Sequence, residues 1–207
     1  MNSNFWFLKG ITKGIQTEKF PDAPPEDLPL WETEIEGNGN VNCPTNAITE
    51  DKWNAEKCIS CRRCFPNYKP TGRLVEIDVK NNVDYFKRSF HIYAMDIGAC
   101  GACNVELNAL SYPEYDFNRL GIFFTNTPRH ADAIIVMGIY TEKMKESFLA
   151  AYDAMPNPKI VVALGACAIN GGILGKAPVS DSIVNIPGCP PNPYLILETL
   201  LKLKGSK

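Results

Sequence analysis

The stretch SFHIYAMDIG, residues 89–98, indicates a buried β-strand, because it is largely apolar, rich in aromatic side chains, and ends at a glycine. Three more apolar runs follow along the chain: RLGIFFTNT (119–127), DAIIVMGIY (132–140) and PKIVVALGAC (158–167). Helical patterns occupy the segments between and after them, at 103–111, 142–155 and 191–204. Near-continuous apolar strands separated by helices are typical of a parallel sheet with both faces covered. The sequence therefore predicts a small, doubly wound α/β domain, flavodoxin-like in scale.

The composition excludes several classes of protein. With 207 residues, 45% of them hydrophobic, the chain can bury one α/β core and carry a smaller appendage. The formal net charge of -2 does not favour a nucleic-acid partner. No apolar run reaches the roughly 18–20 residues that cross a bilayer. The N-terminal stretch MNSNFWFLKG has neither the apolar region nor the cleavage site of a secretory signal, so we expect a cytoplasmic protein.

Eight cysteines are many for a chain in a reducing compartment, where clustered thiols indicate metal or redox sites. Four of them follow predicted strands or precede the last helix, and we call them the second set: Cys100, Cys103, Cys167 and Cys189. Such folds bind ligands at the carboxyl edge of the sheet, so we expect the second set to hold one [4Fe–4S] cluster. Flanking glycines would let the backbone approach it closely. Zinc is the alternative, although the 21 residues between Cys167 and Cys189 fit a zinc ribbon poorly.

The segment CPTNAITEDKWNAEKCISCRRC (43–64) is similar to the middle of a two-cluster bacterial ferredoxin. There the motif is C-x2-C-x2-C-x3-C-P, and the fourth cysteine ligates the other cluster. One cluster has lost every ligand, because the required positions hold Thr33, Glu36, Gly39 and Tyr68. The other keeps all four, and we call these the first set: Cys43, Cys58, Cys61 and Cys64. The sequence therefore predicts a [4Fe–4S] cluster here as well, with zinc as the alternative.

Arg62 and Arg63 lie between ligands of the first set. Positive charge there would raise the potential of a cluster or attract an acidic electron donor. The alternative is that both arginines are solvated surface charges that have neither effect.

Four segments resemble one family in the same order: MDIGACGACNVEL, YDFNRLGIFFTNTPRHAD, GACAINGG and PGCPPNP. That family is the small subunit of group 4, membrane-bound, energy-converting [NiFe]-hydrogenases, which is homologous to the terminal-cluster subunit of complex I. The resemblance covers residues 88–204. It implies that the second set ligates the proximal [4Fe–4S] cluster, which passes electrons to a nickel–iron site in a separate large subunit. The chain lacks that subunit's paired CxxC nickel motifs.

The resemblance implies an electron-relay subunit with two [4Fe–4S] clusters, peripheral on the cytoplasmic side of the membrane. Its implied partners are the [NiFe] large subunit, membrane-arm subunits, and another iron–sulfur subunit or a ferredoxin as electron donor. The CxxC pair Cys100 and Cys103 resembles the hydrogenases, whereas complex I-type subunits look as though they use adjacent cysteines. Two alternatives stay open: a complex I-like oxidoreductase that reduces a quinone or a sulfur compound, and a zinc-binding assembly subunit.

Glu106 follows Cys103 by three residues, on the first turn of a predicted helix. The resemblance places it near the catalytic subunit, in a candidate proton route. A carboxylate that merely favours the helix N-terminus is the alternative. Arg129 and His130 also match the family pattern and are candidates to contact the cluster or the partner subunit, with a structural hydrogen bond as the alternative.

The N-terminal stretch FWFLKGITKGIQTEKFP (5–21) resembles the beginning of ferredoxin-like subunits of complex I-type assemblies, which start with an interfacial helix. Its apolar residues recur at helical spacing, and packing on the protein's own core is the alternative. We therefore divide the chain into an amphipathic helix and extended strap at 1–40, a single-cluster ferredoxin-like module at 41–80, and a flavodoxin-like domain at 85–207.

Overall fold

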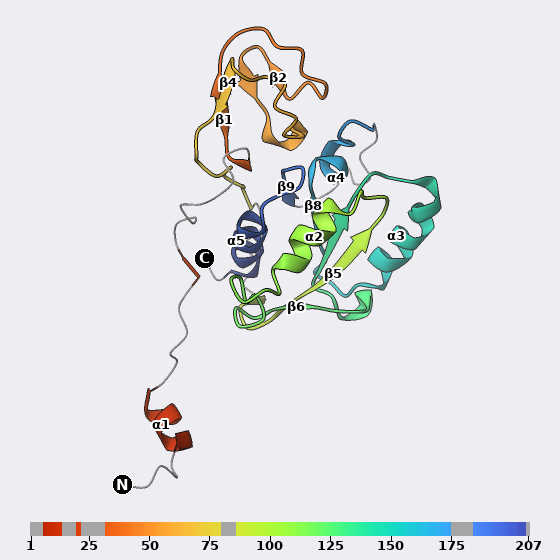
Figure 1. Cartoon of the computed structure of the whole chain (residues 1–207). Helices are drawn as coiled ribbons and strands as arrows, with labels where there is room; N and C mark the ends of the chain where they lie inside the picture. Colours follow the sequence, from red (N-terminus) through yellow and green to blue (C-terminus); the bar gives the residue numbers. More distant parts are fainter. Residues whose placement is uncertain (1–5, 14–19, 22–31, 80–85, 175–183, 206–207) are drawn as a thin grey trace.

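The computed structural model describes residues 6–13, 20–21, 32–79, 86–174 and 184–205 (Figure 1). Two regions are visible within these ranges. A group of very short strands lies next to one edge of a five-stranded sheet that is flanked by helices. The predictions for Phe5, Ile15 and most of the extended strap fall outside the described residues.

The five-stranded sheet is parallel throughout, and its strands lie in the order β6–β5–β7–β8–β9. The strands are β5 (Phe90–Asp96), β6 (Ile122–Phe124), β7 (Ala133–Met137), β8 (Ile160–Leu164) and β9 (Val184–Ile186). Counted along the chain within this sheet, the order is 2-1-3-4-5, which is the flavodoxin-like order. The predicted doubly wound α/β fold is confirmed.

Helices cover both faces of this sheet. The helices are α2 (Ala102–Ala109), α3 (Glu142–Ala154), α4 (Ala166–Asn170) and α5 (Pro193–Lys204). Side chains of the central strand β7 alternate between two apolar clusters, as the period of two in a strand requires. Ile135 packs in the cluster that contains Leu107 of α2 and Leu200 of α5, whereas Ile134 packs in the cluster with Phe148 of α3. This two-sided burial explains why the strand is apolar at every position.

Two short elements were not predicted from the sequence. The run predicted as a strand at 158–167 ends at Leu164, and α4 begins at Ala166, because Gly165 has a φ of 88° that turns the chain. Strand β9 has only three residues, too few for a periodic pattern to identify. The third location of the second set therefore also follows a strand of the sheet.

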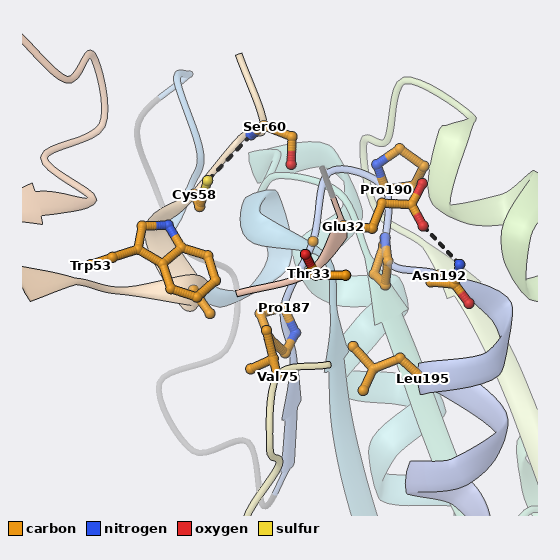
Figure 2. Close-up of a pocket in the computed structure, with 13 residues that line it drawn as sticks. Glu32, Thr33, Trp53, Cys58, Ser60, Val75, Pro187, Pro190, Asn192 and Leu195 are labelled. Carbon is orange, nitrogen blue, oxygen red and sulfur yellow. Dashed lines mark hydrogen bonds between the residues drawn. The ribbon is translucent and has the colours of Figure 1, made fainter. Parts of the chain in front are cut away.

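The region that contains the first set has little regular structure. Strand β1 (Ile35–Gly37) pairs antiparallel with β4 (Tyr68–Pro70), and β2 (Ile48–Thr49) pairs with β3 (Lys52–Trp53). A single 3-10 turn, η2 (Ala55–Lys57), leads into Cys58 and contacts α4. Strand β1 lies in the segment predicted as helix and strap, and it pairs with the predicted module. Figure 2 shows Trp53 and Cys58 facing Pro187 and Pro190 across a pocket between the two regions.

An N-terminal helix, α1 (Trp6–Lys13), forms where the sequence predicts one. Its apolar residues Leu8 and Ile11 are 44% and 73% exposed, so they do not pack on the protein's own core. In the part of the chain that the structure describes, every helix is too short or too polar to span a bilayer.

Candidate iron–sulfur sites

The sheet topology brings the second set together. Strands β5, β8 and β9 are parallel, so their carboxyl ends, Asp96, Leu164 and Ile186, meet at one edge. The loop after β5 carries Cys100 and leads into Cys103 on α2. Cys167 lies on α4 after β8, and Cys189 lies in the loop between β9 and α5. The cysteines belong to three segments distant in sequence, and the fold brings them to one place.

The thiols of the second set affect one another's ionisation. The pKa of Cys103 rises to about 12, first because the thiol is buried and then because of charge on Cys189, Cys100 and Cys167. Burial and charge on Cys100 also raise the pKa of Cys167. Thiols that disfavour the ionisation of their neighbours need a cation among them to become thiolates together. Iron in a cluster supplies that charge, so the residues present fit the group.

Glycine is required where the backbone meets two of these sulfurs. A Cβ added to Gly165 would lie 2.6 Å from the Cys103 Sγ, and one added to Gly172 would lie 3.0 Å from the Cys167 Sγ. Both residues also have a positive φ, of 88° and 55°. The chain therefore leaves space around the thiols that any larger residue would fill.

Asp96 organises the loop that carries Cys100, a role the sequence analysis missed. Its Oδ1 accepts hydrogen bonds from the N–H groups of Gly98, at 2.9 Å, and Ala99, at 2.7 Å. Its Oδ2 accepts a bond from the Asn104 Nδ2 at 2.9 Å. Burial alone would raise the pKa of Asp96, but these bonds together lower it, so the ionised form is favoured. An aspartate two residues before a glycine at a strand end was the available signal.

The first set lines one pocket, although its members come from a loop with almost no secondary structure. The four thiols lie around it together with Ala47, which is 2% exposed, and Ile48. The pKa of Cys64 rises because of burial and then because of charge on Cys58, Cys61 and Cys43. The structure therefore brings Cys43 to the three cysteines of the CxxCxxC run, as the crossover spacing predicts.

Backbone N–H groups point at two sulfurs of the first set. The Ala47 N–H donates to the Cys43 Sγ at 3.3 Å, and the Ser60 N–H donates to the Cys58 Sγ at 3.4 Å. Burial would raise the pKa of Cys43, but hydrogen bonds from Thr45, Ala47 and Ile48 together lower it. Bonds of this kind stabilise a thiolate and tune the potential of a cluster that it binds. Ser60, at a φ of 51°, is one of the non-glycine residues in the left-handed region that let the loop curl around the thiols.

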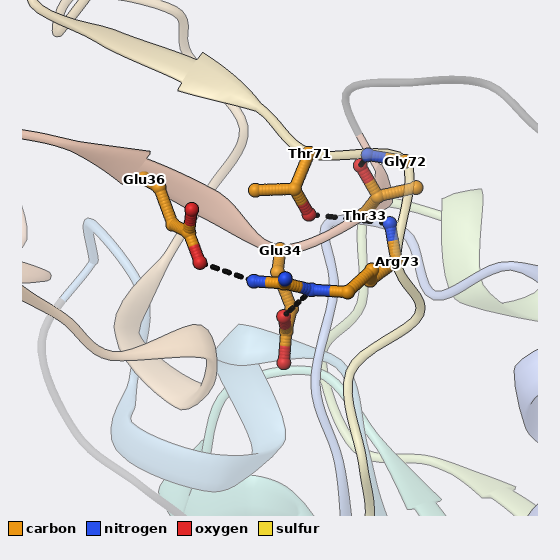
Figure 3. A network of polar contacts seen from close by, with 6 residues as sticks. All are labelled: Thr33, Glu34, Glu36, Thr71, Gly72 and Arg73. Carbon is orange, nitrogen blue, oxygen red and sulfur yellow. Dashed lines mark hydrogen bonds and ion pairs between the residues drawn. The ribbon is translucent and has the colours of Figure 1, made fainter.

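The positions of the missing ferredoxin cluster hold a network of hydrogen bonds. Tyr68 is 1% exposed, and its hydroxyl donates to the Asp51 Oδ1 at 3.2 Å, the same oxygen that accepts from the Gly39 N–H at 3.0 Å. Thr33 accepts from the Gly72 N–H at 3.1 Å, and Glu36 pairs with Arg73 (Figure 3). Arg73 also bonds Glu34 at 3.0 Å. Polar contacts connect the segments that a second cluster would have joined.

The described side chains do not form a site for a single metal ion. Among the described residues, no three His, Cys, Asp or Glu side chains are placed to hold a single metal ion. A [4Fe–4S] cluster makes a different demand, because each of its four irons takes one thiolate from around the cluster. All eight thiols are free.

Glu106 does not lie on the first turn of its helix, where the sequence predicts it. Helix α2 begins at Ala102, one residue earlier than predicted, and no acidic residue occupies its first turn. Burial, followed by the charge of Glu32, raises the pKa of Glu106. Because Glu106 lies beyond the first turn of α2, the interpretation that its carboxylate favours the helix N-terminus is wrong.

Arg129 and His130 lie in η4 (Pro128–His130), immediately before β7. The second set lies at the carboxyl ends of the strands. The five residues of β7 separate the two positions by roughly 16 Å of strand. Contact between these side chains and the second set is therefore excluded, and their contact with a partner subunit stays a prediction.

Comparison with known proteins identifies the region that contains the second set. Residues 100–203 match the family described as the 20 kDa subunit of NADH ubiquinone oxidoreductase. One relative is a subunit of the NADH-quinone oxidoreductase of Citrifermentans bemidjiense. It is 38% identical over 144 residues, which are 66% of this chain and 84% of that protein.

A second relative is the probable membrane-bound hydrogenase subunit mbhJ of Pyrococcus furiosus. It is 34% identical over 121 residues, covering 55% of this chain and 72% of that protein. Among solved structures, a chain of the archaeal membrane-bound sulfane sulfur reductase has 29% identity and a TM-score of 0.48, over 57% of this chain and 72% of that one. The sequence relatives are subunits of oxidoreductase complexes, including a hydrogenase. The match over half of its length shows that the chain belongs to the family of the 20 kDa subunit of NADH ubiquinone oxidoreductase.

Proposed function

We propose that this chain is an electron-relay subunit of a membrane-associated [NiFe]-hydrogenase, with one [4Fe–4S] cluster on each set of four cysteines. The observation that carries the proposal is the convergence of the second set at the carboxyl edge of the sheet, within the region that matches the family. When bound, the clusters supply one-electron chemistry; the protein contributes position and potential.

The two proposed clusters would have different roles, and each would lie in one of the domains predicted from the sequence. The module at 41–80 would hold the cluster nearer the electron donor, and the domain at 85–207 would hold the cluster nearer the nickel–iron site of a separate large subunit. Cys61 is the exposed thiol of the first set, and the neighbouring Arg62 and Arg63 are exposed as well. This positive surface suits an acidic ferredoxin or iron–sulfur subunit as donor.

The segment at 1–40 would attach the chain to neighbouring subunits or to the membrane surface. Its helix α1 presents Leu8 and Ile11 to solvent, an arrangement typical of a surface that a partner or a lipid headgroup layer covers. The proposed location is peripheral, on the cytoplasmic side of the membrane.

The choice of hydrogenase over a quinone or sulfur reductase rests on the CxxC pair Cys100 and Cys103, which resembles the hydrogenases. The test is to purify the intact complex through a tag on this chain and to sequence the large subunit. Two CxxC pairs in that subunit, together with hydrogen-dependent reduction of a viologen dye, are expected. A complex that reduces a quinone or polysulfide but does not react with hydrogen would contradict the hydrogenase proposal.

Glu106 is proposed to lie on a proton route to the catalytic subunit. Its half-buried carboxyl has a raised pKa, so it exchanges its proton nearer to neutral pH than an exposed glutamate does. In the purified complex, Glu106→Gln should lower the rate of proton reduction while both clusters keep their spectra. Full activity in that variant would exclude the route.

A further inference from the structure

One pocket lies at the boundary between the module and the sheet, between a cysteine of the first set and a loop that carries a cysteine of the second set. The pocket at this boundary has Trp53 and Cys58 on the module side. On the sheet side it is bounded by Gly188 and Pro190, the two neighbours of Cys189 in the chain (Figure 2). Cys58 is thus the member of the first set that lines this boundary pocket, and Cys189 lies in the loop opposite.

Glu56 joins the two regions beside this pair. Its side-chain Oε1 accepts a hydrogen bond from the Asn185 Nδ2 at 2.9 Å, and its backbone carbonyl accepts one from the Asn170 Nδ2. Asn170 lies on α4, three residues after Cys167, and Asn185 lies on β9, four residues before Cys189. One residue of the module thus contacts two of the segments that carry the second set.

The same single turn holds both Glu56 and Cys58. The Glu56 N–H donates to the Asn54 Oδ1 at 2.9 Å, which caps η2, and the Cys58 N–H donates to the Ala55 carbonyl at 3.1 Å. Because only Lys57 separates Glu56 from Cys58 on a capped turn, a shift of one moves the other. A further bond, from the Asn192 Nδ2 to the Glu32 Oε2 at 2.8 Å, holds the far side of the pocket.

We propose that Glu56 is a positioning residue that fixes the Cys58 turn against the Cys189 loop, so that the shortest path between the two iron–sulfur sites crosses Cys58 and Cys189. This inference rests on the proposed function, since it needs a cluster on each set. With a cluster on each set, one electron would pass between them, which would oxidise the first site and reduce the second without exchange of a bond or a proton. The carboxylate acts as a hydrogen-bond acceptor here, so its charge is not required.

The test uses the purified complex with both sites reduced, and the readout is the spin–spin splitting of the two clusters by EPR. Glu56→Gln keeps an acceptor for Asn185 and should retain the native splitting. Glu56→Ala should weaken the splitting, and the double variant Glu56→Ala with Asn170→Ala, which removes both bonds, should lose it. The matched control is Glu76→Ala, because Glu76 is exposed and has no hydrogen bond or ion pair among the described residues.

Iron and sulfide analysis of the same samples separates the two proposals. A native chain that lacks either cluster would overturn the proposed function, and this inference with it. A double variant that holds both clusters and shows the native splitting would overturn the role of Glu56 alone. If the double variant loses iron, hydrogen–deuterium exchange decides the question: faster exchange in segments 166–170 and 184–189 is expected, and unchanged exchange there contradicts the proposal.

Discussion

The two sets of cysteines reach a similar arrangement by opposite means. The second set depends on long-range structure, because three parallel strands deliver its residues to one edge and a half-buried thiol, Cys103, packs onto Gly165. The first set depends on local structure, because a 22-residue segment with two-residue strands curls around the pocket, and N–H groups at Ala47 and Ser60 point at its sulfurs. A site built by a sheet should fail when its packing changes, whereas a site built by a loop should fail when a ligand or a polar contact changes.

The largest expected effect is that of Gly165→Ala. The new Cβ would lie 2.6 Å from the Cys103 Sγ at a φ of 88°, so the loop after β8 and the thiol cannot both keep their places. The variant should lose about four of the eight irons, all from the second set, and keep the first cluster. Iron analysis with EPR checks this, and Gly10→Ala is the control, because a Cβ at Gly10 meets nothing within 4 Å. Retention of both clusters would show that Gly165 does not limit the site.

The next effect tests the crossover assignment in the first set. Cys43→Ser and Cys61→Ser should each remove or convert the same cluster, because both thiols line one pocket, although 17 residues lie between them. Cys189→Ser is the matched variant and should affect the other cluster. EPR of the reduced complex distinguishes the two signals. An intact first cluster in the Cys43 variant would mean that another residue provides the fourth ligand.

A smaller effect is expected at a position that a two-cluster ferredoxin would use as a ligand. Thr33→Val keeps the shape of the side chain but removes the oxygen that accepts from the Gly72 N–H at 3.1 Å. Because Thr33 is 2% exposed, the loss should lower the free energy of unfolding by about 1 kcal/mol and leave both clusters in place. Denaturant unfolding measures this, with Thr49→Val at an exposed strand position as the control. Loss of a cluster in the Thr33 variant would contradict its purely structural role.

The smallest effect concerns pH and the boundary between the two regions. The pKa of Glu106 is raised in the folded protein from its ordinary value of 4.5, so the folded state binds more protons than the unfolded state just above that pH. Its ionisation therefore lowers stability as pH rises, and below about pH 4.5 the effect disappears. Glu106→Gln should be slightly more stable than the native chain at neutral pH and equal to it in acid. Thermal unfolding at several pH values checks this, and a variant that is less stable at neutral pH would contradict the assigned direction.

The sheet could be predicted largely from the sequence, because β7 and β8 are buried at every position and therefore read as continuous apolar runs. Strand β9 and helix α4 could not, since three and five residues are too few to show a period. Because α4 was not predicted, the strand predicted at 158–167 is too long, whereas β8 ends at Leu164, just before Gly165.

The sequence could predict that each set of four cysteines lies together, from motif spacing for the first set and from the strand ends for the second, but not which residues connect the two sets. The bonds of Glu56 to Asn170 and Asn185 join positions more than 110 residues apart, as the separations of 114 and 129 show, and the sequence carries no local signal for them. Tyr68 is similar: the sequence shows that a cysteine is absent, and only the fold shows that its hydroxyl bonds Asp51. Ligand motifs can be recognised in the sequence, whereas hydrogen bonds between distant regions can be identified only in the folded structure.

The presence of two clusters is tested most directly by iron, sulfide and zinc analysis of the anaerobically purified protein, combined with EPR after full reduction. We expect about eight irons and eight sulfides per chain, no stoichiometric zinc, and two magnetically interacting clusters. Four irons per chain, or zinc in place of iron with no EPR signal, would contradict the claim that each set of four cysteines holds a [4Fe–4S] cluster.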